Sequence, residues 1–524
     1  MTTGVQTAEP IRSRRNHWNN QIATHALMRP DAVAVRFRGQ DTTWKQLHER
    51  SLKFADSLAR RGVGFGDRVL ILALNYTEYL EAVFGINALG AIAVPVNFRL
   101  TPPEVAYIVS DSGAAAIVTD SLLQPLAIGV MAQSEQLKTC VVIGGTTGDG
   151  VIGYDDFLAE TGEPHVPQDI PEDTPALIMY TSGTTGSPKG AILSYANLNS
   201  QALTCIRAMN STPDTIAFCT SPLFHIAGLG SLAPAFMLGS KTVLHPLGAF
   251  NATEFLDAIE AEQATTAFCV PAQWQVICED PTVKTRKLAL ETLSWGAAPA
   301  SETVLRAMAE CFPDAQNVAV FGQTEMSPIT CVLEGKDALR KLGSVGQPIP
   351  TIQTRVVDDE MNDVAPGEIG EIVYRGPTMM QGYWNKPEAT AEAFAGGWFH
   401  SGDLVRQDEE GFVWVVDRKK DMIISGGENI YCAEVENVLF AHPKIHEAAV
   451  VGRAHEKWGE VPVAVVALLE GETLTLEELS EFLNENLARY KHPKDLVIVP
   501  ELPRNASGKV VKVQLRKEYA DYAG

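Results

Sequence analysis

The sequence predicts an α/β protein with a large N-terminal domain and a small C-terminal domain. Its 524 residues exceed one compact core, because a domain usually holds about 100–200 residues. Apolar runs at 69–74 and 91–96 enclose a helical pattern at 76–89, which indicates a strand–helix–strand unit. Apolar runs without polar alternation are typical of a parallel sheet that is covered on both faces.

The C-terminal segment indicates a second, smaller α/β unit. Thr475 and Glu478 have the spacing of a capping box, and a helical apolar stripe follows them. Strand-like runs at 447–452 and 463–469 precede this predicted helix. The charged segment 415–424 lies between two apolar runs, and we expect the domain boundary near it.

Composition excludes several functional classes. The net charge of −22 argues against nucleic acid as a partner and requires any site for an anionic ligand to be a local cationic patch. Eight cysteines lie singly without a C-x-x-C pair, which favours reduced thiols and a cytoplasmic location.

The sequence contains no pattern of a secretory signal or a transmembrane helix. Arg12, Arg14 and Arg15 are followed by no apolar segment, and no apolar run reaches the ~20 residues that a membrane helix needs. The run at 226–239 is broken by glycines and a proline, and we expect it in the core. The three arginines leave open at most weak peripheral membrane contact.

The stretch YTSGTTGSPKGAIL, residues 180–193, indicates a phosphate-binding segment. Its hydroxyls and glycine amides can donate hydrogen bonds to oxyanions, and an apolar run precedes it. It is not a Walker loop, because Pro188 precedes Lys189 and Gly190 stands where Ser or Thr is required. A flexible Ser/Gly linker is the alternative on composition, but the embedded lysine favours anion binding.

This stretch resembles the signature loop of the adenylate-forming superfamily, which includes acyl-CoA synthetases, luciferase and peptide-synthetase adenylation domains. Further segments are similar to that family's motifs in the same order. They are PLFHIAG at 222–228, GAAP at 296–299, FGQTE at 321–325, SGD at 401–403, DRKKD at 417–421, SGGENI at 425–430 and PRNASGKV at 503–510. The resemblance covers nearly the whole chain.

The resemblance implies stacked, mostly parallel sheets in an N-terminal adenylation domain at 1–416. It also implies a hinge at 417–420 that contains Lys420, and a mobile C-terminal domain at 421–524. The implied ATP- and AMP-binding residues are Thr181, Ser182, Gly183, Thr184, Thr185, Gly186, Lys189, Gly296, Ala297, Ala298, Phe321, Gly322, Gln323, Thr324, Asp403, Val415, Arg418 and Lys509.

The reaction joins a carboxylate to ATP, and both are anions that repel each other. Each implied residue would neutralise or position one of these charged groups. By resemblance, the 181–189 segment would hold the β- and γ-phosphates, and Glu325 with Thr181 would hold Mg²⁺. Thr324 would contact the α-phosphate, and Asp403 and Arg418 would hold the ribose. Lys509 would be catalytic, because its charge opposes the repulsion between the substrate carboxylate and the α-phosphate.

The acyl pocket implied by resemblance begins at His225. Peptide-synthetase adenylation domains have an aspartate there for the substrate ammonium, so an amino acid is disfavoured as substrate. The implied pocket residues are His225, Ile226, Ala227, Gly228, Leu229, Val270, Trp274 and Met326. These apolar walls favour an alkyl or aryl acid. Small residues at Ala227, Gly228 and 296–298 predict space for a medium or long chain.

The sequence therefore predicts a fatty-acid–CoA ligase, most similar to bacterial, including actinobacterial, medium- and long-chain enzymes. A carboxylic acid and ATP would give acyl-AMP and pyrophosphate, and CoA would then give acyl-CoA and AMP. Ser425, Gly426 and Gly427 would contact the CoA arm. The alternatives are an aryl-, cinnamoyl- or steroid-acid–CoA ligase and an acyl-AMP ligase that loads a carrier protein. A homodimer is left open.

Overall fold

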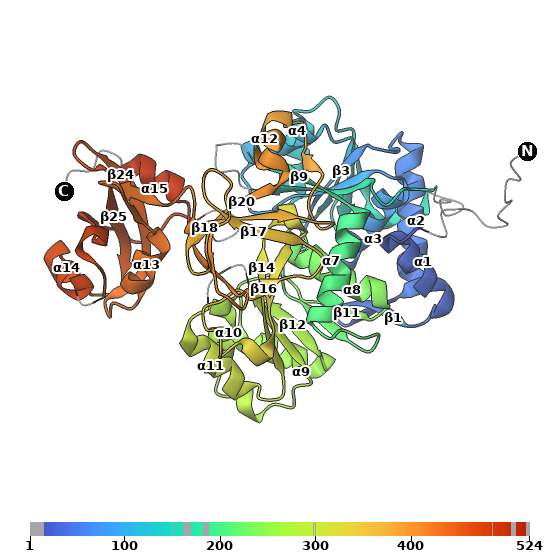
Figure 1. Cartoon of the computed structure of the whole chain (residues 1–524). Coiled ribbons are helices and arrows are strands. Elements are labelled where there is room, and N and C mark those ends of the chain that lie inside the picture. The colour runs from blue at the N-terminus through green and yellow to red at the C-terminus, as the bar shows by residue number, and fades with distance from the viewer. Residues whose placement is uncertain are drawn as a thin grey trace, which may run out of the picture. The chain divides into compact units, whose positions relative to one another are not determined.

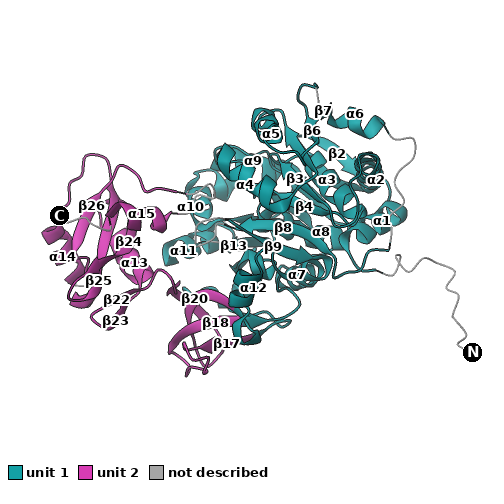
Figure 2. Ribbon diagram, turned by 90° about the horizontal axis from the view of Figure 1, so that it is seen from above, with its two compact units in different colours: residues 1–353, 374–399 teal, residues 354–373, 400–524 magenta. Residues whose placement is uncertain are grey.

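The computed structural model describes residues 15–148, 150–160, 169–181, 188–296, 298, 300–484, 486–504 and 510–519. The chain forms two compact units (Figure 2). Unit 1 contains Met1–Gln353 and Tyr374–Phe399, and unit 2 contains Thr354–Val373 and His400–Gly524. Unit 2 thus includes segments that precede residue 416, and the predicted hinge at 417–420 stays a prediction.

The first sheet of unit 1 contains the predicted strand–helix–strand unit. Strand β3 and strand β4 are parallel, with Val69 opposite Ala93, and helix α3 connects them. Every residue of α3 except Glu78 is buried, and the buried Glu81 forms an ion pair with Arg50 at 2.7 Å. In spatial order the sheet contains β19 (Gly382–Tyr383), β9 (Lys189–Ser194), β8 (Pro175–Thr181), β4 (Ile92–Pro95), β3 (Arg68–Leu72), β5 (Ala116–Asp120), β6 (Thr139–Ile143) and β7 (Val151–Gly153).

The second sheet of unit 1 is also mostly parallel. Only its ends, where β14, β15 and β16 meet and where β1 meets β2, pair antiparallel in the described residues. In spatial order it contains β16 (Gln347–Pro348), β15 (Ile329–Leu333), β14 (Gln316–Gly322), β13 (Thr292–Gly296), β12 (Thr266–Cys269), β10 (Ile216–Cys219), β11 (Lys241–Leu244), β1 (Val33–Phe37) and β2 (Gln40–Thr43).

Several helices of unit 1 begin at a residue whose side chain caps the helix. Helix α2, for example, follows Thr43, whose Oγ1 accepts a hydrogen bond from the Gln46 N–H at 3.2 Å. The α-helices are α1 (Trp18–Met28), α2 (Trp44–Arg60), α3 (Thr77–Ala88), α4 (Pro102–Ser112), α5 (Gln124–Met131), α6 (Tyr154–Ala159), α7 (Tyr195–Ala208), α8 (Ile226–Leu238), α9 (Ala252–Glu262), α10 (Pro271–Glu279), α11 (Glu302–Cys311) and α12 (Pro387–Ala393). The 3₁₀ helices are η2 (Val283–Thr285), η3 (Thr324–Met326), η4 (Gly335–Asp337) and η5 (Ala395–Gly397).

The apolar run at 226–239 forms helix α8, which is largely buried and packs beside α7 (Figure 1). This confirms the predicted core position. Among the described residues, no helix combines the length and hydropathy that a membrane span requires. All eight cysteines are free.

Unit 2 contains a four-stranded sheet and a five-stranded sheet. The first comprises β17 (Gln353–Val357), β18 (Ile369–Arg375), β20 (Phe399–Gln407) and β21 (Val413–Arg418). The second comprises β23 (Glu428–Ile430), β22 (Ile423–Ser425), β25 (Gly459–Leu468), β24 (Ile445–His455) and β26 (Asp495–Ile498). The helices are α13 (Cys432–Phe440), α14 (Leu476–Asn484), η6 (Arg489–Lys491) and α15 (Lys512–Tyr519).

The local predictions for unit 2 are confirmed. The Thr475 Oγ1 accepts a hydrogen bond from the Glu478 N–H at 3.2 Å at the start of α14. Leu479 and Leu483 of α14 are buried against β24, β25 and α13 in one apolar core. The predicted strands at 447–452 and 463–469 belong to β24 and β25, which pair antiparallel.

Candidate active site

Glu325 is the centre of a polar cluster in unit 1. It lies in η3 and is only 8% exposed. Its Oε1 accepts a hydrogen bond from the Tyr383 hydroxyl at 3.0 Å and a longer one from the Thr181 Oγ1 at 3.4 Å. Its carbonyl oxygen accepts from the Met380 N–H at 2.7 Å. The structure therefore brings together the predicted metal-site residues, Glu325 and Thr181, and adds Tyr383.

The charge of this cluster suits a cation. Glu325 forms no ion pair with a lysine or arginine among the described residues, so its buried carboxylate has no counter-charge in that part of the chain. No group of three acidic, histidine or cysteine side chains that could hold a metal occurs in the described ranges. Mg²⁺ is commonly held by one or two carboxylates together with substrate phosphates and water. The residues present therefore fit a magnesium ion that arrives with a phosphate ligand.

The two ends of the 181–189 segment are held in place. Thr181 ends β8 and pairs across the hairpin with Lys189, which begins β9. The Tyr180 hydroxyl donates to the Asp111 Oδ2 at 2.7 Å. The Tyr107 hydroxyl donates to the Pro188 carbonyl at 3.2 Å. Ser182, Gly183, Thr184, Thr185 and Gly186 lie outside the described residues.

Lys189 lies close to Tyr383 of this cluster. Its Nζ is 5.2 Å from the centre of the Tyr383 ring, within the range of a cation–π contact. Burial, followed by the charge of Glu325, raises the pKa of Tyr383 above its ordinary value. Tyr383 is therefore a neutral hydrogen-bond donor at physiological pH.

The predicted nucleotide-binding segment at 321–324 follows strand β14. Phe321 is half-buried, and its carbonyl accepts from the Thr330 Oγ1 at 3.1 Å. The Gln323 Nε2 is buried without a hydrogen-bond partner in the described part of the chain. An unpaired buried amide is costly, so this donor suits a ligand acceptor. Ala298 is exposed, and Ala297 lies outside the described residues.

Asp403 and Arg418, the predicted ribose-binding pair, lie together in unit 2. They are opposite each other on β20 and β21, and the Arg418 Nε is 2.9 Å from the Asp403 Oδ1. Asp403 is 4% exposed, whereas the Arg418 side chain is 44% exposed. Val415, on the same strand as Arg418, is also exposed.

Glu371 supports this pair and was not found from the sequence. Its carboxylate accepts from the Gly402 N–H at 3.0 Å, and its Oε2 lies 3.2 Å from both the His400 Nδ1 and the Lys419 Nζ. Glu371 therefore links the part of β20 that precedes Asp403 to Lys419 in the predicted hinge. A lone glutamate in a strand gives no sequence signal for such a role.

The predicted hinge and CoA residues lie on the surface of unit 2. Lys420 is exposed between β21 and β22, and Ser425 ends β22. The Gly426 N–H donates to the Trp458 carbonyl at 2.7 Å, and the Trp458 ring lies where a side chain at Gly426 would project. Gly427 is exposed, and Lys509 lies outside the described residues.

Several of the predicted acyl-pocket residues form the start of α8. His225 is the N-cap, and its Nδ1 accepts from the Ala227 N–H at 3.1 Å, so the other ring nitrogen carries the proton in the neutral form. Ile226, Leu229 and Met326 are buried.

Trp274 occupies a packed position rather than an open wall. It is fully buried between Phe255 and Phe312, and its Nε1 donates to the Ser294 carbonyl at 3.1 Å. Val270, the residue that caps α10, is half-buried. A place for Trp274 in the acyl pocket stays a prediction.

Gly228 and Gly296, from which we predicted space for a long chain, have a packing role instead. A Cβ at Gly228 would lie 2.1 Å from the Pro222 carbonyl oxygen, and one at Gly296 would lie 2.3 Å from the Val320 carbonyl oxygen. Backbone atoms of neighbouring segments fill both positions. Gly228 and Gly296 therefore do not by themselves indicate room for a long alkyl chain.

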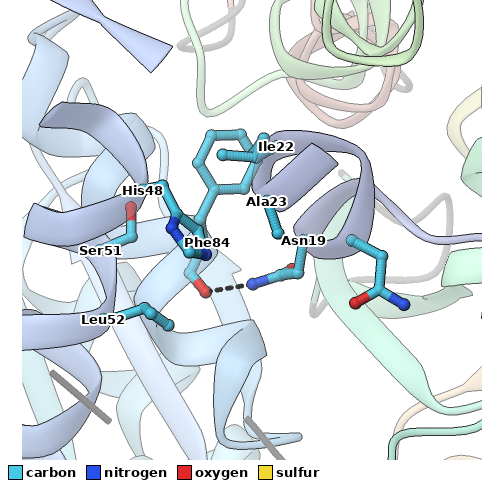
Figure 3. A pocket seen from close by; sticks show the side chains of 8 residues that line it. Asn19, Ile22, Ala23, His48, Ser51, Leu52 and Phe84 are labelled. Carbon is cyan, nitrogen blue, oxygen red and sulfur yellow. Dashed lines mark hydrogen bonds between the residues drawn. The ribbon is translucent and has the colours of Figure 1, made fainter. Parts of the chain in front are cut away.

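A small pocket elsewhere in unit 1 contains none of the predicted site residues. Helices α1, α2 and α3 line it with Asn19, Ile22, His48, Ser51 and Phe84, among others (Figure 3). The Asn19 Nδ2 donates to the Phe84 carbonyl at 2.7 Å across it. We attribute this pocket to the packing of the three helices.

Comparison with known proteins gives matches over both units. The model of the AMP-binding enzyme family matches residues 22–384, and that of the AMP-binding enzyme C-terminal domain matches residues 434–509. The chain is 39% identical to an indoleacetate–CoA ligase of Aromatoleum aromaticum, over 95% of this chain and 97% of the relative. It is 38% identical to a feruloyl-CoA synthase of an Amycolatopsis species, over 94% and 97%.

Solved structures agree with the sequence matches. The o-succinylbenzoate CoA synthetase of Bacillus subtilis, in complex with its acyl-adenylate intermediate, superposes with a TM-score of 0.86. The two sequences are 32% identical, and the match covers 95% of this chain and 98% of that one. The same enzyme is also known in complex with ATP and a magnesium ion.

Proposed function

This chain belongs to the AMP-binding enzyme family, and from that premise we propose that it joins an aromatic carboxylic acid to CoA. At the level of the family, it is an ATP-dependent, AMP-forming acid–CoA ligase that uses ATP, Mg²⁺ and CoA. The proposal concerns the acid. It replaces the fatty acid of the sequence-based prediction by the aryl acid that was the alternative.

The observation that carries this choice is the identity of 38–39% to ligases named for indoleacetate and ferulate, over 94–95% of the chain. Both acids carry a flat ring, as does the succinylbenzoate of the matching structure. The packing role of Gly228 and Gly296 removes two of the residues that favoured a long alkyl chain. Buried apolar Ile226, Leu229 and Met326 suit a ring as well as a chain.

The described residues support the first half-reaction as follows. Oxygen of the substrate carboxylate attacks the α-phosphorus of ATP, the bond to the β-phosphate oxygen breaks, and acyl-AMP and pyrophosphate form. Glu325 and Thr181 would hold Mg²⁺, which spreads the negative charge that develops on the phosphates. Lys189 would bind the departing pyrophosphate, and Asp403 would accept hydrogen bonds from the ribose hydroxyls.

Two further roles are proposed from the resemblance. Lys509 would bridge the carboxylate and the α-phosphate during the first half-reaction. In the second half-reaction the CoA sulfur attacks the acyl carbon, the acyl–phosphate bond breaks and AMP leaves. Ser425, Gly426 and Gly427 would lie along the path of the CoA arm, and rotation at Lys420 would exchange the two half-reactions.

A panel of acids tests the proposed substrate class. Pyrophosphate release is measured with ATP, Mg²⁺ and CoA for indole-3-acetate, ferulate, benzoate, octanoate and dodecanoate. We expect at least one aromatic acid to exceed both alkyl acids in kcat/KM by about tenfold or more, the usual discrimination of an apolar pocket between shapes. A higher kcat/KM for dodecanoate would restore the fatty-acid assignment.

A further inference from the structure

Tyr383 links two charged groups of the candidate phosphate site. It lies on β19, the edge strand of its sheet, where it pairs with Ala191 of β9. Its hydroxyl donates to the Glu325 Oε1 at 3.0 Å, and its ring faces the Lys189 Nζ at 5.2 Å. One side chain therefore contacts both the candidate magnesium ligand and the candidate phosphate ligand.

We propose that Tyr383 is a positioning residue that orients the Glu325 carboxylate toward Mg²⁺ and holds Lys189 beside the phosphates. The inference rests on the proposed roles of Glu325 and Lys189 but not on which acid is used. A hydroxyl that donates to one oxygen of a metal-binding carboxylate fixes its rotation and leaves the other oxygen for the metal. Here Tyr383 and Thr181 both reach Oε1, so Oε2 is the oxygen left for a cation.

Tyr383 is itself held in a way that suits this role. Its N–H donates to the Thr390 Oγ1 at 2.9 Å, in the middle of α12. Three residues earlier, the Met380 N–H donates to the Glu325 carbonyl at 2.7 Å. The 380–383 segment thus contacts both the backbone and the side chain of Glu325. Supporting contacts of this kind keep a ligand in its productive geometry.

A purely structural role would give a different result. A buried tyrosine hydroxyl requires some acceptor, and the Glu325 carboxylate could serve only that need. Tyr195 provides a matched case, because it is fully buried and its hydroxyl donates to the Asn87 carbonyl at 3.0 Å. Loss of either hydroxyl should lower stability. Only Tyr383→Phe should alter the response to magnesium.

The experiment measures ATP affinity of the full chain by calorimetry without acid or CoA, once with Mg²⁺ and once with a chelator. The ratio of the two dissociation constants reports how much magnesium strengthens ATP binding, and no turnover is needed. For Tyr383→Phe we expect this ratio to fall about tenfold, the usual effect of losing an outer contact to a metal ligand. For Tyr195→Phe we expect the same ratio of dissociation constants as in the unaltered protein.

Two further variants separate the hydroxyl from the ring. Tyr383→Phe keeps a ring over Lys189, so metal-free ATP affinity should stay within about twofold. Tyr383→Leu removes the ring as well, and metal-free affinity should fall further. Thr390→Val removes the acceptor of the Tyr383 N–H and should lower the magnesium ratio in the same direction by a smaller factor. This variant tests the inference even if a substitution at position 383 prevents folding.

The outcomes are distinguishable. Equal magnesium ratios for Tyr383→Phe, Tyr195→Phe and the unaltered protein would overturn the inference. An unchanged ratio in Glu325→Gln would overturn it too, by removing Glu325 from the metal site. Absence of acid-dependent pyrophosphate release with any acid, while the magnesium ratio behaves as expected, would overturn the proposed function and leave the inference on Tyr383 supported.

Discussion

Replacement of Glu325 by glutamine should separate activity from stability. Glutamine keeps the shape of the side chain, and its carbonyl oxygen can still accept from the Tyr383 hydroxyl, which is 3.0 Å from Oε1 in the structure. Only the negative charge is lost. Because that charge is 8% exposed and has no ion-pair partner in the described chain, its removal should relieve an electrostatic cost in the protein without ligands.

Glu325→Gln should lower the activity but should not lower the stability. Removing one preorganised electrostatic group from a reaction centre costs about 3–4 kcal/mol, so pyrophosphate release should fall by about 10²–10³-fold. A buried polar group that lacks a partner costs about 1–3 kcal/mol, and the hydrogen bonds that Glu325 accepts from Tyr383 and Thr181 lower this figure. The free energy of unfolding without ATP should therefore stay the same or rise by up to ~1–2 kcal/mol.

A continuous assay of pyrophosphate release at saturating ATP and Mg²⁺ measures the activity. Calorimetric unfolding of the same preparation measures the stability. Glu325→Asp is the matched control, because it keeps the charge but shortens the reach to Tyr383. Parental activity in Glu325→Gln would refute the magnesium role. A loss of activity together with a loss of more than ~2 kcal/mol of stability would show that the residue acts through the fold.

Three other substitutions give independent predictions. Lys509→Ala should slow adenylate formation by about 10²–10³-fold in an ATP–pyrophosphate exchange assay while leaving ATP affinity within about threefold, and parental exchange would remove Lys509 from catalysis. Asp403→Asn should raise the KM for ATP by about 10–100-fold, because hydrogen bonds to a charged acceptor are worth about 1.5–3 kcal/mol, and an unchanged KM would exclude it from the ribose site. Burial lowers the pKa of His17 to about 4, so the unfolded chain binds the extra proton and stability should fall as pH drops from 6.5 toward 4, by up to ~3 kcal/mol. His17 is 4% exposed, and its Nδ1 has no hydrogen-bond partner among the described residues. His17→Phe should therefore remove that part of the pH dependence in unfolding measurements at pH 7 and pH 4.5, and an identical pH dependence would contradict a buried neutral ring.

Local patterns in the sequence were sufficient for the local structure. The apolar runs around β3, α3 and β4, and the capping pair Thr475 and Glu478, depend on neighbours along the chain. Their contacts are therefore encoded within short windows. The order of strands in the sheets is not encoded in short windows, because strands such as β19 and β9 pair although they are far apart in the sequence.

The same limit explains which site residues were missed. Tyr383, Glu371 and Asp111 make their contacts to residues that are distant in sequence, and none stands in a motif with its own signal. Gly228 and Gly296 were interpreted as space because the sequence does not show that backbone carbonyls of Pro222 and Val320 occupy it. Pocket shape depends on the same long-range packing, so the sequence motifs alone do not distinguish an alkyl acid from an aryl acid.

The most direct measurement of the central claim is a competition among acids. The purified chain is given ATP, Mg²⁺, CoA and an equimolar mixture of indole-3-acetate, ferulate and dodecanoate, and the thioesters are identified by mass. We expect an aryl-CoA as the main product, with AMP and pyrophosphate formed in equal amounts. Dodecanoyl-CoA as the main product would contradict the aromatic substrate, and formation of ADP in place of AMP would contradict the adenylate route.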